Sequence, residues 1–244
     1  MPICHEANMM VHQKTALPQG WFHGNPIGHE AISGGKVKTI TLVCQKGGPG
    51  KSTMATNLAV VAGRGKNRVL LIDLDPQGTT AKWYDKRQAE TPSVVTITAT
   101  QLVEALKRAS SANIDIVIID TAGRDDQASS AAIKAADYCL VPCRPSPADM
   151  GDIQPTVEGL RRQEKPFAFV VTQTPASGFR IREAEAGLGH HGTVAPVPIV
   201  YRVAYQDALG NGEGVFEFEP EGKATREILA LWHWINRELR KLDG

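Results

Sequence analysis

The sequence predicts an α/β protein in which a doubly wound, mostly parallel sheet is flanked by helices. Three observations favour this class. From residue 37 onward, short β-branched runs alternate with stretches of helical periodicity, which is typical of successive strand–helix units. The first run leads through a glycine-rich turn into a helix, and two later runs end in aspartate. With 244 residues, 42% of them hydrophobic and 22% charged, the chain can bury a core.

Each expected element follows from its local pattern. Short apolar runs rich in β-branched residues predict strands at residues 39–44, 69–73, 94–98, 114–119, 138–141, 167–172 and 193–197. Stretches with apolar residues at helical spacing predict helices at 51–62, 80–89, 101–110, 127–136, 150–163 and 181–188, with two more at 204–209 and 225–241. No internal repeat interrupts the series. Residues 37–244 are therefore expected to form one domain.

Charge and cysteine content exclude several classes of protein. The chain carries 27 Lys and Arg against 26 Asp and Glu, so contact with DNA or a membrane requires a local basic patch. No window approaches the roughly 18 consecutive apolar residues of a membrane-spanning helix. Cys4, Cys44, Cys139 and Cys143 are too few for a disulfide scaffold, and Cys139 and Cys143 are interpreted as core residues. We expect a soluble protein of the reducing cytoplasm.

Residues 1–36 differ from the rest of the chain. They hold four of the seven histidines, several Gly and Pro residues and no sustained apolar periodicity, which predicts a flexible N-terminal extension. They lack the apolar stretch of a signal peptide. Metal binding by these histidines and Cys4 is an alternative, but their spacing matches no zinc motif.

The strongest chemical signal lies in the first strand-to-helix turn, Lys46-Gly-Gly-Pro-Gly-Lys-Ser-Thr53. In such a loop, backbone N–H groups and the positive end of the following helix face an anion. Lys51 is placed to reach the β- and γ-phosphates of a nucleotide, and Ser52 to bind Mg²⁺. A plain glycine-rich turn does not account for Lys-Ser directly after the last glycine. The nucleotide-binding residues expected here are Gly47, Gly48, Gly50, Lys51, Ser52 and Thr53.

Two carboxylates follow the second expected strand. Asp73 and Asp75 lie two residues apart and therefore on the same side, toward the edge where ligands bind in open parallel sheets. They are candidates for Mg²⁺ and for the attacking water. The alternative is a capping and turn cluster, since Asp-Pro and Gln-Gly are ordinary turn pairs.

A third motif, residues 115–123, is an apolar strand that ends in Asp120. This is the arrangement in which a carboxylate holds a water of the Mg²⁺ shell. Thr121 and Gly123 then belong to a loop whose order depends on the γ-phosphate. A structural cap is the alternative for Asp120, but three motifs in the right order make coincidence unconvincing.

Together these motifs resemble the ParA/MinD superfamily of ATPases, and in particular short ParA partition proteins. The segment 46–53 is similar to the family's deviant Walker A motif, and residues 73–77 are similar to its D-x-D-P-Q motif. Pro49 departs from the Val or Ala common in the family and removes one N–H from the loop. The resemblance implies a P-loop NTPase fold with ATP and Mg²⁺ as cofactors.

The resemblance also implies catalytic roles for Lys46, Lys51 and Asp75. Lys46 would cross an ATP-dependent homodimer to the partner's phosphates, and Asp75 would polarise the hydrolytic water. Ser52, Asp73 and Asp120 would serve the metal. Residues 140–149 resemble a loop of the dimer face, and the similarity of later segments places Thr172, Gln173, Pro198 and Ile199 at the adenine base.

The last expected helix separates the functional alternatives. Ile228, Trp232, Ile235, Leu239 and Leu242 recur at helical spacing and predict one apolar face. Basic residues of the same helix are candidates for DNA phosphate contacts: Arg226, Arg237, Arg240 and Lys241, with Arg180 and Arg182 as a second cluster. A solvated basic side without function is the plain alternative, and a MinD-like protein would instead press Trp232 and Trp234 onto a membrane.

We therefore expect a ParA-like partition ATPase. The resemblance implies that the ATP-bound homodimer binds duplex DNA without sequence preference on the nucleoid and that a ParB-like partner stimulates hydrolysis. Such a cycle would segregate or position plasmid, chromosomal or other cargo, without stable membrane association. A MinD-like membrane-cycling ATPase and a metabolic enzyme on the same fold are the alternatives.

Overall fold

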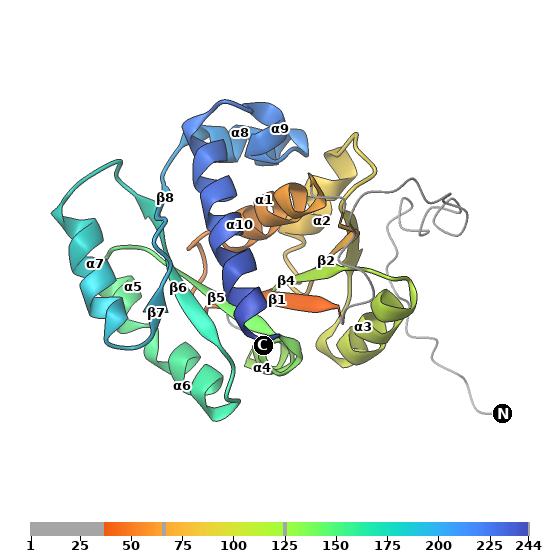
Figure 1. The fold of residues 1–244 in the computed structure, drawn as a ribbon, viewed down its shortest axis with the longest axis horizontal. Helices are drawn as coiled ribbons and strands as arrows, with labels where there is room; N and C mark the ends of the chain where they lie inside the picture. The colour runs from red at the N-terminus through yellow and green to blue at the C-terminus, as the bar shows by residue number, and fades with distance from the viewer. Residues whose placement is uncertain (1–36, 65–66, 124–125, 244) are drawn as a thin grey trace.

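The fold was obtained as a computed structural model, shown in Figure 1. The structure describes residues 37–64, 67–123 and 126–243. The expectations for residues 1–36, a flexible extension with metal-binding potential, lie outside the described residues.

A parallel sheet forms the centre of the domain. Its strands are β1 (Lys38–Leu42), β2 (Val69–Asp73), β3 (Ser93–Thr96), β4 (Ile116–Asp120), β5 (Tyr138–Cys143), β6 (Phe167–Thr174), β7 (Thr193–Val194) and β8 (Ile199–Val200). Their order is β3-β2-β4-β1-β5-β6-β7, and β8 also pairs with β6. Every described pairing is parallel. The predicted doubly wound α/β class is confirmed.

Helices cover both faces of the sheet (Figure 1). One face carries α1 (Lys51–Arg64), α2 (Thr79–Lys86), α8 (Val203–Asn211), α9 (Val215–Phe218) and α10 (Lys223–Lys241). The other carries α3 (Leu102–Ser111), which the 3₁₀ turn η2 (Ala99–Gln101) precedes, together with α4 (Asp126–Ala135), α5 (Pro147–Gly151), α6 (Gln154–Arg162) and α7 (Phe179–Gly189).

Three buried apolar clusters, distributed over the two faces of the sheet, follow from the alternation of side chains along each strand. In β1, Ile40 and Leu42 pack with α1 and α10, whereas the Thr41 hydroxyl donates to the Ala132 carbonyl of α4 at 3.1 Å. Because both faces are covered by helices, most strand residues are buried, and β2, β4 and β5 are buried throughout. Cys139 and Cys143 are among these core residues, as predicted.

The expected helix at 150–163 is only partly confirmed: α6 lies within this range, but residues 150–151 belong to a separate helix, α5. α5 begins earlier, at Pro147, and the Ser146 hydroxyl caps it by accepting from the Asp149 N–H at 3.2 Å. Pro155 lies in the first turn of α6, where its missing N–H costs nothing, so a new helix begins there. The expected strand at 193–197 is also only partly present, since β7 ends at Val194 and β8 was not predicted.

Helix α10 is the last packed element of the domain. Ile228, Trp232, Ile235 and Leu239 are buried in the core beneath it, as the spacing predicted, but Leu242 follows the helix end and is 46% exposed. Trp232 and Trp234 are 5% and 7% exposed. The apolar face therefore packs on the sheet and does not lie open to a membrane. Within the described residues, no helix is long and apolar enough to cross one.

Candidate phosphate and metal site

The turn between β1 and α1 contains the predicted phosphate loop. Gly48 and Gly50 have φ angles of +88° and +92°, in the left-handed region that glycine adopts without steric cost. Lys51 begins α1 and is 6% exposed. Its ammonium donates to the carbonyls of Cys44 at 3.2 Å and Lys46 at 3.1 Å. This places a buried positive charge inside the loop at a helix N-terminus, the local chemistry of a phosphate site.

A buried carboxylate faces this loop from the end of β4. Asp120 is fully buried, and its Oδ2 accepts from the Thr80 hydroxyl at 2.9 Å. Its Oδ1 has no hydrogen-bond partner among the described residues. Burial and the charge of Asp73 raise the pKa of Asp120 to about 7, against the effects of Ser52, Thr80 and Lys51. A buried oxygen without a partner, beside the Ser52 hydroxyl, fits a Mg²⁺ ion that takes its other ligands from phosphate and water.

Asp73 and Asp75 differ in burial and in the hydrogen bonds that they accept. Asp73 is fully buried beside Asp120, its partner in the β2–β4 register. Its carboxylate accepts from the N–H groups of Asp75 at 2.9 Å and Ala81 at 3.2 Å, so it holds the start of α2 in place. Burial raises the pKa of Asp73 to about 6. Asp75 is half-buried, and its Oδ1 accepts from the Gln77 N–H at 2.9 Å. Both the capping interpretation and the position near the metal site therefore apply to Asp73.

The loop after β4 packs directly on the phosphate loop. The Thr121 hydroxyl donates to the Leu42 carbonyl at 2.9 Å, which ties the end of β4 to the end of β1. A Cβ atom on Gly123 would lie 3.0 Å from the Gly47 nitrogen, so any larger residue would press on the phosphate loop. The loop after β4 and the phosphate loop are therefore in direct contact.

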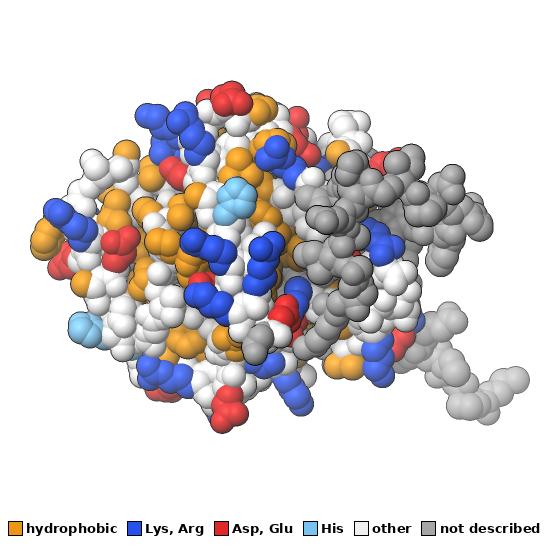
Figure 2. Space-filling view, in the orientation of Figure 1, with side chains coloured by type: hydrophobic (Ala, Val, Ile, Leu, Met, Phe, Trp, Pro, Cys, Tyr) orange, Lys and Arg blue, Asp and Glu red, His pale blue; other side chains and the backbone are white. Residues whose placement is uncertain are grey.

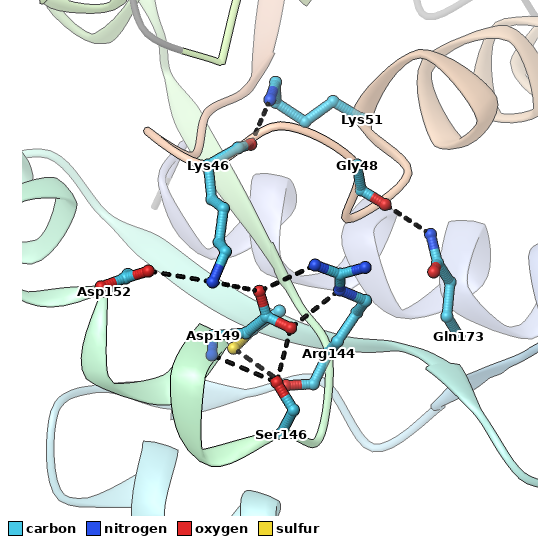
Figure 3. A network of polar contacts seen from close by, with 9 residues as sticks. Lys46, Gly48, Lys51, Arg144, Ser146, Asp149, Asp152 and Gln173 are labelled. Atoms are coloured by element: carbon cyan, nitrogen blue, oxygen red, sulfur yellow. Dashed lines mark hydrogen bonds and ion pairs between the residues drawn. The ribbon is translucent and has the colours of Figure 1, made fainter.

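Lys46 extends away from Lys51 into an ion-pair cluster on α5 and the residue that follows it (Figure 3). Its ammonium lies 3.0 Å from Asp149 Oδ1 and 2.9 Å from Asp152 Oδ2. Arg144 binds the same Asp149 carboxylate through two nitrogens, at 2.8 and 3.0 Å. Hydrogen bonds to Asp152 and Asp149 raise the pKa of Lys46. In this arrangement Lys46 is engaged within its own chain.

A pocket of about 170 Å³ adjoins the loop at Gly50 and Thr53. This pocket is lined by three of the four residues that were expected to contact the adenine base, namely Thr172, Gln173 and Ile199. Pro198 is not among the described residues that line it, because the wall begins one residue later, in β8. Residues that sequence reasoning missed complete the wall: Val200, Tyr201, Arg202, Tyr205 and Gln206. The resemblance over residues 196–208 marked this segment without resolving which side chains face the pocket.

Exposed basic residues gather along α10, as Figure 2 shows for this side of the molecule. The exposed residues of the helix are Lys223, Arg226, Ala230, His233, Arg237, Arg240 and Lys241, and they include no acid. We call this surface the basic face of α10. Of the two acids of the helix, Glu227 binds Arg202, whereas Glu238 pairs with Lys241, one of the cations of this face. Arg180 and Arg182 are exposed on α7, which packs against the opposite face of the sheet.

Comparison with known proteins agrees with this geometry. A family model described as the CobQ/CobB/MinD/ParA nucleotide binding domain matches residues 40–213. The chain therefore belongs to this family of nucleotide-binding domains, which confirms the resemblance found in its motifs. A relative from Gloeobacter kilaueensis, named maintenance of carboxysome distribution protein A, is 30% identical over 211 residues, covering 83% of this chain and 94% of the relative.

Solved structures share the fold. A Cyanothece McdA variant in complex with ATP has a TM-score of 0.69 at 17% identity, over 83% of this chain and 98% of that one. The septum site-determining protein MinD from Pyrococcus horikoshii, complexed with Mg-ADP, has a TM-score of 0.67 at 16% identity, over 82% and 96% of the two chains. At these identities the likeness concerns the fold alone.

Proposed function

We propose that residues 37–244 form a ParA-like positioning ATPase that uses ATP and Mg²⁺. The observation that carries the proposal is the convergence of Lys51, Ser52 and Asp120 at one point of the sheet edge. Their chemistry matches a triphosphate with its metal. The relatives support it, since solved neighbours contain ATP or Mg-ADP.

In this proposal the chain's own groups bind and orient the nucleotide. Lys51 and the loop N–H groups hold the β- and γ-phosphates, while Ser52 and the free Asp120 oxygen hold the metal. Bound Mg²⁺ would neutralise charge that develops on the phosphate oxygens. Asp75, half-buried at the rim, orients the attacking water, and Asp73 fixes the segment that carries Asp75.

The dimer step assigns a second position to Lys46. In the described conformation its ammonium is paired with Asp149 and Asp152. To reach a partner's phosphates in an ATP-bound homodimer, Lys46 must exchange these carboxylates for phosphate oxygens. Both are anionic partners, so the exchange preserves charge pairing.

The basic face of α10 is the proposed contact for duplex DNA. Its residues present a row of exposed cations, of which only Lys241 is paired with an acid of the helix, Glu238, and such a row suits contact with phosphates and needs no base-specific groups. Arg226, Arg237, Arg240 and Lys241 are the proposed contacts. The name of the Gloeobacter relative, maintenance of carboxysome distribution protein A, supports a role in distributing a cargo. The resemblance to ParA adds the nucleoid as the place of action and a ParB-like partner that stimulates hydrolysis. No stable membrane association is expected, since Trp232 and Trp234 pack inside the domain.

Nucleotide variants test the ATPase step. Lys51→Ala should abolish ATP binding, because the buried cation of the loop is lost. Asp75→Ala should retain ATP and accumulate the dimer, because only water activation is lost. Phosphate release and sedimentation with ATP measure both. Phosphate release at the parent rate in Lys51→Ala would refute the assignment.

A charge-reversal pair tests the DNA step. Replacing Arg237, Arg240 and Lys241 by Glu should remove ATP-dependent DNA binding and leave the dimer intact. The matched control reverses Lys107, Lys134 and Arg162, three exposed cations on α3, α4 and α6 across the sheet. Each phosphate contact adds about 0.9 to the slope of log affinity against log salt. Equal loss in both variants would show that net charge, not the basic face of α10, holds DNA.

A further inference from the structure

Two side chains at the carboxyl end of β6 bind carbonyls of the phosphate loop. The Thr172 hydroxyl donates to the Pro49 carbonyl at 2.8 Å, and Gln173 Nε2 donates to the Gly48 carbonyl at 2.6 Å (Figure 3 shows the second contact). Two successive carbonyls of the loop are thus bound from the same strand, 123 and 125 residues away in sequence.

Gln173 reaches the loop through an unusual backbone conformation. The pairing of β6 with β8 shifts between Thr172 and Thr174, which marks a β-bulge at Gln173. Its φ angle is +52°, in the left-handed region that side chains other than Gly, Asn and Asp seldom adopt. Bulges beside ligand sites re-aim a side chain that the regular strand would direct elsewhere. Here the re-aimed amide meets Gly48.

The hydrogen bonds to the Gly48 and Pro49 carbonyls also orient the backbone N–H groups of the loop. A trans peptide unit is planar, and its C=O and N–H point in opposite directions. Because the Thr172 hydroxyl holds the Pro49 carbonyl toward β6, the Gly50 N–H of the same peptide unit points away from β6. The preceding unit ends in Pro49, which has no N–H, so Gln173 fixes the hinge at Gly48 without withdrawing a phosphate donor. Gly48 and Gly50 are the loop residues with positive φ angles, and the two contacts hold the peptide units next to both.

We propose that Gln173 is a positioning residue for the phosphate loop, which it holds in the phosphate-receiving conformation through Gly48. The inference rests on the proposed nucleotide binding at this loop. It differs from the expectation that Gln173 reads the adenine base. A base-reading side chain discriminates between nucleotides, whereas a loop-positioning side chain serves every ligand that places phosphates in the loop.

Two variants separate the hydrogen bond from the backbone conformation. Gln173→Met fills a similar volume without a donor, and Gln173→Gly removes the side chain while accepting the positive φ. Glu164→Gly is the matched control, because Glu164 has the same φ of +52° in the exposed turn between α6 and β6. Thermal unfolding without nucleotide identifies any loss that comes from misfolding.

The probes are Mg²⁺ complexes of a non-hydrolysable ATP analogue, a non-hydrolysable GTP analogue and inorganic tripolyphosphate, measured by calorimetric titration. Both Gln173 variants should bind each probe about three- to tenfold more weakly, the value of one neutral hydrogen bond. Glu164→Gly should bind like the parent. The ratio of ATP to GTP affinity should stay constant.

Three results would overturn the inference. Unchanged affinity in Gln173→Met would show that the hydrogen bond to Gly48 does not position the loop. A loss confined to the ATP analogue would assign Gln173 to the base. An equal loss in Glu164→Gly would trace the effect to glycine substitution in general. If the parent itself binds none of the three probes, the proposed function fails and this inference fails with it.

Discussion

Replacing Asp149 by Asn perturbs the ion-pair cluster that holds Lys46. Burial alone raises the pKa of the Asp149 carboxyl, but hydrogen bonds from Arg144, Ser146 and Lys46 outweigh this effect and lower the pKa from 3.8 to about 2. The carboxylate is 7% exposed, so water screens little of the interaction. At about 1.4 kcal/mol per tenfold change in acidity, the lowered pKa corresponds to about 2 kcal/mol of stability at neutral pH.

Asp149→Asn should therefore lower the free energy of unfolding by about 2 kcal/mol at pH 7, or the melting temperature by about 4–8 °C in a domain of this size. A lowered carboxyl pKa stabilises the fold in full only above the pKa of the unfolded chain, and the stabilisation is lost as the pH falls through the pKa of the folded state. The difference between variant and parent should thus shrink as the pH falls from about 4 toward about 2. Urea unfolding followed by circular dichroism at pH 7, 5 and 3 measures this difference.

Asp152→Asn provides the matched control for the same lysine. Asp152 pairs with Lys46 at 2.9 Å, but its side chain is 62% exposed, so this loss should stay below about 1 kcal/mol. Equal losses in the two variants, or a loss in Asp149→Asn that is as large at pH 3 as at pH 7, would refute the reasoning.

Two further predictions concern buried charges. Arg87→Met should lower the free energy of unfolding by about 3 kcal/mol or more, because Arg87 is 4% exposed and its loss leaves the half-buried Glu217 carboxylate without its two-nitrogen partner. Chemical denaturation measures this loss, with Arg68→Met at an exposed pair as the control; equal losses would contradict the burial argument. Without nucleotide and Mg²⁺, stability should fall as the pH rises from about 4 to about 8, because folded Asp120, with its pKa raised to about 7, keeps a proton that the unfolded chain releases. Thermal scans across this range should show a flatter dependence for Asp120→Asn, and an unchanged slope would assign the effect elsewhere.

The sequence by itself determined the parts of the site that depend on chain-local order. Lys51 and Ser52 follow a glycine-rich turn between a strand and a helix, and Asp73 and Asp120 end apolar strands. Parallel strands present their carboxyl ends at one edge, so a correct assignment of strands already predicts that these groups meet. The register of Asp73 with Asp120 is the structural expression of that rule. The basic face of α10 could likewise be predicted from the sequence, because helical spacing fixes which residues lie on the same side of a helix.

Tertiary structure alone decided which distant groups hold the site in position. Lys46 pairs with Asp152 across 106 residues, and the Thr80 hydroxyl reaches Asp120 across 40. The contact of Gln173 with Gly48 depends on a bulge that arises only when β8 pairs with β6. None of these contacts has a local signature, because side-chain direction at a strand end or loop is set by packing between elements. Periodicity and motif spacing describe one element at a time, so they do not predict how the elements pack against one another.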